Sequence, residues 1–357
     1  MLQRTLPVAA FLGLLLAGCG AQDPHTRVST ALTEGVLLPG YAAWAEADRQ
    51  LAESARAFCA GAQSLEQARQ EYLRAQRGWA AVQPLQLGPL SENNLAWQVQ
   101  FWPDKKNLVA RQVEALLNSQ PELAQAQLDK GSVVVQGLTA YEYVLFDPNI
   151  DLSDSASQQR YCPLLIAIGN HQLTLSTDVL ARWTGEDGMQ ARLRNFPNER
   201  YADAQEAVSD LLRTQVSAID GLKKKLGAPL GRQNKGVPQP YQAEAWRSGY
   251  SLASLAAALE SAERLWQGAD QDGLRSLLGS EHSEHSELAT RIDTAYADTR
   301  QRLGALNQPL GQLLGEEAGR SALNELYDSL NRLHRLQEGE LARALGIQIG
   351  FNAHDGD

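Results

Sequence analysis

Apolar residues recur every three or four positions along most of the 357-residue chain, and strand-like alternation is scarce. The chain is also rich in Ala, Leu, Gln and Glu, and most of these residues favour helices. We therefore predict an all-α protein. Capping and breaking residues place the main helices after Pro39-Gly40, from Ser64, from Asp104 and from Ser155, and then at about 199–226, 241–267, 281–304 and 316–345.

The stretch from 184 to 198 is the best candidate for a domain boundary, because it contains Gly185, Gly188 and Pro197. A chain of this length usually exceeds the size of one hydrophobic core. We predict two packed helical-bundle domains of about four main helices each, at 29–190 and 199–350.

The segment from Gly131 to Phe146 is apolar almost all the way round a helix, which is typical of a buried helix. At about 100° per residue its polar side chains fall on one narrow stripe. They are Gln136, Thr139, Glu142 and Tyr143. Because an unpaired carboxylate is costly to bury, we expect Glu142 to face a wet cleft, a cation or a hydrogen-bonding network.

Residues 137–142, Gly-Leu-Thr-Ala-Tyr-Glu, resemble the Gly-x-His-x-x-Glu signature of the imelysin family, the imelysin-like or insulin-cleaving-membrane-protease-like bacterial envelope proteins. Thr139 stands where that signature has His. Other segments are also similar to parts of the family, namely 79–89, 101–104, 161–162 and 245–249. The resemblance covers roughly the whole mature chain and implies two helical-bundle domains with the motif near their junction.

The N-terminus has the pattern of a lipoprotein signal. Arg4 precedes an apolar stretch, and Leu16-Ala17-Gly18-Cys19 forms a lipobox, so we predict a signal peptide at 1–18 and a lipid-modified Cys19. The alternative, a membrane span, needs about 20 apolar residues, and this run is shorter. Residues 19–28 are expected to be a tether. Gly20 after the cysteine indicates the outer membrane, with the protein facing the periplasm.

Two further cysteines, Cys59 and Cys162, remain, and an oxidising envelope favours a disulfide between them over two buried thiols. Removal of residues 1–18 takes one basic residue from the 32, which leaves 31 basic against 42 acidic residues and a net charge of −11. An acidic chain with dispersed charges argues against a nucleic-acid partner. It would tolerate cationic or metal partners, although a solvated acidic surface is the commoner reason for such a charge.

The main candidate site is Glu142 with Thr139. It is either an anchor for a metal ion, a cation or a small ligand at the domain junction, or a buried carboxylate satisfied by an arginine or by water. A Thr hydroxyl is a weaker ligand for transition metals than an imidazole, so a metal at Glu142 would need other oxygen or nitrogen ligands.

Other candidate ligands lie elsewhere in the sequence. Arg247, followed by Ser248, either reaches the junction and pairs with Glu142 or an anion, or lies at a solvated helix start. Asp104 is more simply an N-cap than a ligand. His282 and His285, with carboxylates between them, could share a metal, but a solvated helix start is the commoner explanation.

The sequence contains no Gly-x-Ser-x-Gly elbow, His-Glu-x-x-His motif, phosphate loop or dinucleotide fingerprint. We therefore favour a non-catalytic envelope lipoprotein that binds a metal ion or a small ligand around Glu142, with iron as the cargo that the family resemblance implies. A metallopeptidase is the alternative. A third hypothesis is a scaffolding lipoprotein that docks an envelope protein through the connection carrying Trp97 and Trp102.

Overall fold

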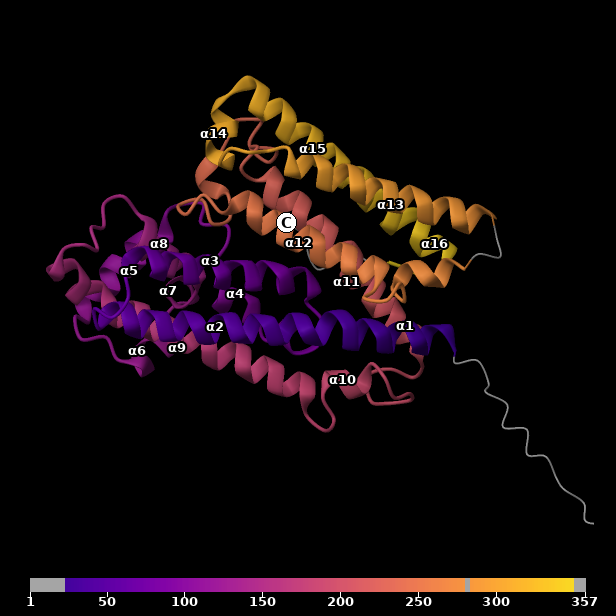
Figure 1. The fold of residues 1–357 in the computed structure, drawn as a ribbon, viewed down its shortest axis with the longest axis horizontal. Coiled ribbons are helices and arrows are strands. Elements are labelled where there is room, and N and C mark those ends of the chain that lie inside the picture. Colours follow the sequence, from indigo (N-terminus) through magenta and orange to yellow (C-terminus); the bar gives the residue numbers. More distant parts are fainter. Residues whose placement is uncertain (1–22, 280–282, 350–357) are drawn as a thin grey trace, which may run out of the picture.

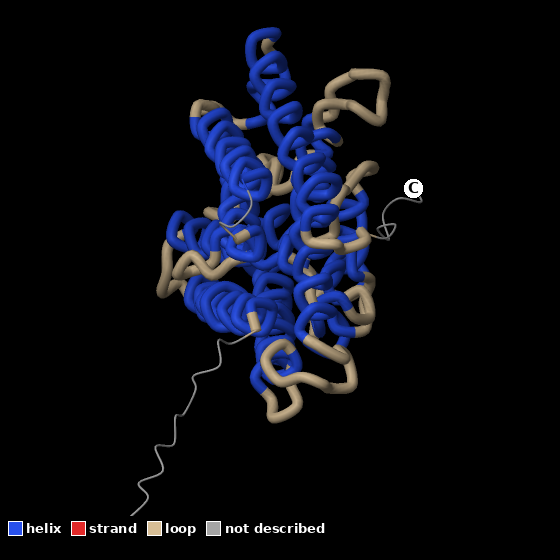
Figure 2. The backbone as a smooth tube through the Cα atoms, turned by 90° about the vertical axis from the view of Figure 1, so that its right-hand side faces the viewer, coloured by secondary structure: helices blue, strands red, loops and turns tan. Residues whose placement is uncertain are grey.

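The computed structural model describes residues 23–279 and 283–349, and within these ranges every regular element is a helix (Figures 1 and 2), which confirms the all-α prediction. Figure 1 shows the long helices in layers. From bottom to top the layers contain α2 (Leu38–Cys59) with α9 (Ser155–Thr184), then α11 (Ala204–Gly227) with α12 (Ser251–Gln267), and then α13 (Ser283–Gly304) with α15 (Glu317–Arg335).

One more long helix, α3 (Leu65–Val82), packs between α2 and α12. Its start matches the sequence prediction, because Ser64 and Gln67 form a capping box. The remaining elements are α1 (Pro24–Leu32), η1 (Thr33–Leu37), η2 (Gln83–Leu85), η3 (Gly88–Ser91), α4 (Leu95–Val99), α5 (Leu108–Ser119), α6 (Gln125–Asp129), α7 (Val133–Gln136), α8 (Leu138–Phe146), α10 (Met189–Arg192), η4 (Pro240–Gln242), η5 (Leu274–Leu278), α14 (Leu310–Gly315), η6 (Leu336–Leu341) and α16 (Ala342–Ala344).

The first helix begins earlier than predicted. Asp23 caps α1, which continues through the π-helical η1 into α2, so the predicted start after Pro39-Gly40 is wrong. Pro39 has no N–H to donate to the carbonyl of Gly35, and that oxygen instead accepts a hydrogen bond of 2.9 Å from the guanidinium of Arg264 on α12. The tether predicted for 19–28 is likewise wrong for 24–28, since these residues are helical and Val28 is buried.

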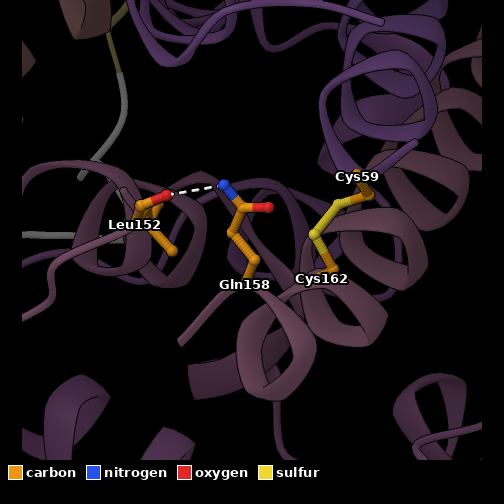
Figure 3. Close-up of a disulfide and its surroundings, with 4 residues drawn as sticks. All are labelled: Cys59, Leu152, Gln158 and Cys162. Atoms are coloured by element: carbon orange, nitrogen blue, oxygen red, sulfur yellow. Dashed lines mark hydrogen bonds between the residues drawn. A yellow bond between two sulfur atoms is a disulfide. The ribbon is translucent and has the colours of Figure 1, made fainter. Parts of the chain in front are cut away.

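A disulfide joins the end of α2 to the first half of α9, as predicted for Cys59 and Cys162 (Figure 3). The two Cα atoms lie 5.6 Å apart, within the usual range for a disulfide. Beside it, the side-chain amide of Gln158 donates a 2.8 Å hydrogen bond to the carbonyl of Leu152, which holds the turn that leads into α9.

The two halves of the chain share buried surface. Helix α3 packs against α12, α1 packs against α11, and the buried apolar side chains of both halves form one continuous cluster. The division into bundles at 29–190 and 199–350 therefore stays a prediction. The observed contact between α3 and α12 brings the motif helix α8 beside the loop that precedes α12.

That loop was predicted as helix. Residues 243–250, here called the junction loop, are irregular, and α12 begins only at Ser251. Ala245 and Gly249 have φ of 49° and 71°, left-handed values that an α-helix does not contain. These two turns aim the polar side chains of the loop at α8.

Candidate functional site

The motif segment is two helices rather than one. Gly137 separates α7 from α8 in an extended conformation, and a Cβ on it would lie 2.4 Å from the carbonyl oxygen of Val99. Only glycine permits this approach. The four polar residues therefore do not lie on one helix face as predicted. Gln136 belongs to α7, and its side-chain amide donates a hydrogen bond to the carbonyl of Leu128 at 2.9 Å.

Glu142 lies on α8 and is only 1% exposed. Its Oε1 accepts two hydrogen bonds from Ser248, one from the backbone N–H and one from the hydroxyl, each 2.8 Å long. Burial raises the pKa of Glu142, while these two donors and the charge of Arg247 act to lower it. The structure thus brings Glu142 and Ser248 together from opposite halves of the chain.

Arg247 does not form the predicted ion pair with Glu142. Its Nε donates to Asp147 at 3.2 Å and its NH2 to Asn107 at 2.8 Å, and the guanidinium stacks on the ring of Trp246 at 4.4 Å. The alternative of a solvated helix start is also wrong, since the side chain is buried. Its NH1 is buried without a hydrogen-bond partner.

A second buried carboxylate lies close to Glu142. Glu244 of the junction loop accepts a 2.5 Å hydrogen bond at Oε2 from Lys225 of α11, which also contacts Gln83. Burial lowers the pKa of Lys225 and Glu244 acts to raise it. The other oxygen of Glu244, Oε1, is buried without a partner. We call Glu142, Glu244, Lys225, Arg247 and Ser248 the junction cluster.

Sequence reasoning missed Glu244 and Lys225. Glu244 falls in a stretch with a helical pattern, and Lys225 is one of three consecutive lysines that read as a solvated helix end. No local signal separates the buried lysine from its neighbours.

A chain of neutral polar side chains extends from the junction cluster into the core. Gln76 of α3 accepts from Tyr72 at 3.3 Å and from Gln100 at 3.0 Å, and donates to Ser254 of α12 at 3.3 Å. Gln100 in turn accepts from the indole of Trp79 at 2.9 Å. Burial raises the pKa of Tyr72, and the charge of nearby Glu142 raises it further.

Other predicted site residues lie away from Glu142. The Thr139 hydroxyl donates to the carbonyl of Phe101 at 2.9 Å. Asp104 accepts from the backbone N–H of Leu108 at 2.7 Å and of Val109 at 3.2 Å, so its side chain serves the start of α5 as the simpler prediction had it, but the N-cap position is Asn107 and the helix begins later than predicted.

The remaining candidates are the histidine, cysteine and tryptophan residues named from the sequence. His285 lies within 3.1 Å of the carbonyl of Leu278, while His282 and Cys19 fall outside the described residues. The indole of Trp102 donates to the carbonyl of Gln242, and Trp97 is 43% exposed. In the described part of the chain, no three or more His, Cys, Asp or Glu side chains group as a metal site.

Comparison with known proteins supports the resemblance. The family model for imelysin matches residues 37–337. The chain belongs to the imelysin family. It is 22% identical over 326 residues to iron-regulated protein A of Synechococcus elongatus, covering 88% of this chain and 85% of the relative.

Two crystal structures share the fold. An imelysin-like protein from Psychrobacter arcticum 273-4 is 24% identical and superposes with a TM-score of 0.78 over 92% of this chain and 97% of its own. A proposed iron-regulated protein A precursor from Parabacteroides distasonis is 16% identical, with a TM-score of 0.70 over 89% and 96%. Among the helices described for this imelysin-family chain, none has the length and apolar character needed to cross a bilayer.

Proposed function

We propose that this protein binds a metal ion or a small polar ligand at the junction cluster, without catalysing a reaction on it, and that iron is the cargo. A relative named iron-regulated protein A supports the link to iron. We further propose that the protein is a lipoprotein anchored through Cys19 in the outer membrane and facing the periplasm.

The observation that carries the binding proposal is the incomplete hydrogen bonding of the junction cluster. Buried polar atoms are normally paired, and unpaired ones point to a missing water, ion or ligand. Here the acceptor Glu244 Oε1 is buried without a partner, and both hydrogen bonds from Ser248 to the Glu142 carboxylate reach Oε1. Two carboxylates with acceptor capacity left, beside the Ser248 hydroxyl, are suited to a cation.

A ligand can reach the cluster only if the junction loop moves. Glu142 is almost inaccessible, and the two hydrogen bonds from Ser248 hold the loop against α8. Ionisation of Glu142 is opposed by burial, so binding should weaken on acidification at a higher pH than for an ordinary glutamate.

The test is iron content after anaerobic loading with ferrous iron and removal of the excess. We expect the untagged protein to retain iron, and both Glu142→Gln and Glu244→Gln to lose most of it. Glu186→Gln, at an exposed position, is the matched control and should bind like the unaltered protein. Equal iron in the unaltered protein and the Glu142→Gln variant would exclude Glu142 from the site.

A metallopeptidase is the alternative function, and it requires a metal that polarises a carbonyl or activates water. The Thr139 hydroxyl is engaged with Phe101, which counts against its acting as the missing ligand. Iron-loaded protein incubated with an unfolded peptide, with and without chelator, tests this alternative. Chelator-sensitive cleavage that Glu142→Gln abolishes would favour the peptidase over simple binding.

Docking of an envelope protein is the remaining hypothesis, and the exposed Trp97 beside Phe101, with ring centroids 5.7 Å apart, is the feature that favours it. Trp97→Ala should then weaken capture of an outer-membrane partner without changing iron content.

A further inference from the structure

We propose that Tyr143, Tyr161 and Glu114 form a ferric-iron site next to the junction cluster, whose Arg247 guanidinium lies 5.2 Å from the centroid of the Tyr143 ring. The three side chains come from three helices, α8, α9 and α5, which pack against one another. The proposal does not depend on the junction cluster binding anything.

The three side chains converge on one carboxylate oxygen. The hydroxyl of Tyr161 donates to Glu114 Oε1 at 2.7 Å, and the hydroxyl of Tyr143 donates to the same oxygen at 3.1 Å. Both rings are buried, so packing fixes where the hydroxyls lie. Glu114 and Arg160 are each 36% exposed, so solvent reaches the carboxylate side of the group.

The spacing of these oxygens suits a small six-coordinate ion. Neighbouring ligand oxygens of an octahedral ion with metal–oxygen bonds of about 2.0 Å lie about 2.8 Å apart. The two observed separations, 2.7 and 3.1 Å, bracket that edge length. A metal that takes the place of the two hydrogen-bonding protons would keep these two oxygen–oxygen separations.

The donor types select the ion. Phenolate and carboxylate oxygens are hard ligands, and tyrosinate is an established axial ligand of haem iron. Ferric iron is the hard, highly charged ion that competes best with protons for phenol oxygens.

Charge and protons balance in the binding step. Burial acts to raise the pKa of Glu114, but hydrogen bonds from Tyr161, Arg160 and Tyr143 hold it below its usual value, so the carboxylate is ionised. Both tyrosine hydroxyls donate hydrogen bonds to Glu114, so the phenols are neutral before binding. Binding would form three iron–oxygen bonds, break the bonds from iron to the three chelator or water atoms that these oxygens replace, and release two phenol protons to water. Two phenolates and one carboxylate then offset the three positive charges.

Arg160 lies beside the coordination positions that the three protein ligands would leave open. Its NH2 donates to the other oxygen of Glu114 at 2.9 Å and to Asn118 at 2.8 Å. It orients the carboxylate and places a positive charge beside the open side of the site. A small chelating anion carried by the iron would be favoured there.

The protein contains a matched control cluster. Tyr201 donates to Asp210 at 2.8 Å, and Arg200 donates to the same carboxylate at 3.2 Å. Like the proposed site, this cluster combines a tyrosine, a carboxylate and an arginine. The carboxylate comes from Asp instead of Glu, and there is one phenol instead of two. It should not hold ferric iron.

The experiment is titration of the full chain with ferric nitrilotriacetate, followed by visible absorption and proton release. We expect a phenolate-to-iron charge-transfer band, and two phenol protons released per iron bound after correction for the protons that the displaced nitrilotriacetate takes up. Tyr143→Phe and Tyr161→Phe should each weaken iron binding at least about tenfold. The double variant should lose the band, while Tyr201→Phe and Glu142→Gln should retain it.

Several results would overturn the proposal. They are absence of the band in the unaltered protein, an equal band in the Tyr143→Phe/Tyr161→Phe variant, and loss of the band in Tyr201→Phe. Helicity by circular dichroism checks that each Phe variant is folded. The ferrous-iron content of the Glu142→Gln variant measures binding at the junction cluster separately. If the band is missing, the proposal for the junction cluster still stands. If the junction cluster binds no ferrous iron, a band that does not depend on Glu142 still supports the ferric site.

Discussion

Glu142 and Asp48 both carry buried carboxyl groups, but they differ in their hydrogen bonding. Glu142 receives two hydrogen bonds from Ser248. Asp48, in the middle of α2, is fully buried with both oxygens unpartnered, and burial raises its pKa to about 8. The nearby hydroxyl of Ser176 donates to its own helix, to the carbonyl of Gln172. Asp48 is therefore neutral at physiological pH.

Asp48→Asn should stabilise the protein at neutral pH. Between the ordinary aspartate pKa of 3.8 and about 8, the unfolded chain has lost a proton that the folded chain keeps, so the free energy of unfolding falls as pH rises. The slope is at most about 1.4 kcal/mol per pH unit. Asn has no proton to lose, so the variant should melt higher at pH 7 to 8 and close to the unaltered protein near pH 4.

Melting temperature measured by circular dichroism at several pH values checks this. Asp187→Asn, at an exposed position, is the control and should follow the unaltered protein throughout. A pH-independent difference between Asp48→Asn and the unaltered protein would contradict a neutral buried carboxyl.

At the scale of single elements, helix boundaries depend on contacts that lie far away in sequence. The break at Gly137 exists because the chain at Val99 passes too close for a side chain. The helix through Pro39 continues because Arg264 binds the carbonyl that the proline leaves free. Local patterns predicted one helix in the first case and a helix start in the second.

Gly137→Ala should destabilise the protein by about 1–3 kcal/mol or more, because the backbone must shift to accommodate the new methyl group. Gly221→Ala is the matched substitution. Gly221 lies inside α11, and no other atom lies within 4 Å of the place that an added Cβ would occupy, so the change should stabilise by up to about 1 kcal/mol. Urea unfolding measures both, and similar effects in the two variants would disprove the close approach at Gly137.

At the scale of the whole molecule, the halves are joined through polar as well as apolar contacts. The Cys59–Cys162 disulfide acts within the first half, whereas the hydrogen bonds from Lys225 to Gln83 and from Ser248 to Glu142 link the first half to the second. Burial of so many polar groups at the contact makes it specific, because each displaced partner would leave an unpaired atom.

Loss of the disulfide should lower stability by up to about 4–5 kcal/mol, since it closes a segment of 103 residues. The Cys59→Ser/Cys162→Ser variant should unfold at lower urea concentration than the oxidised protein. The oxidised protein with reductant should shift to match it. An unchanged midpoint after reduction would show that the crosslink does not limit the unfolded chain.

The sequence alone determined the helical class, most helix positions, the disulfide, the family and the need of Glu142 for hydrogen-bond partners. These follow from periodicity, cysteine count and a local motif, all of which can be read from the sequence. It singled out Ser248, which donates to Glu142, but misassigned Arg247, because the choice between Glu142 and Asp147 depends on how α8 and the junction loop pack.

Only the tertiary structure decided which charged groups are buried and which meet. Lys225 and Glu244 look like surface residues in sequence, and Glu114 shares no motif with Tyr143 and Tyr161. Burial and pairing of such groups result from contacts between helices that are distant along the chain, and no local pattern encodes those contacts. The elements of this protein are therefore local in origin, whereas its candidate binding sites arise from packing.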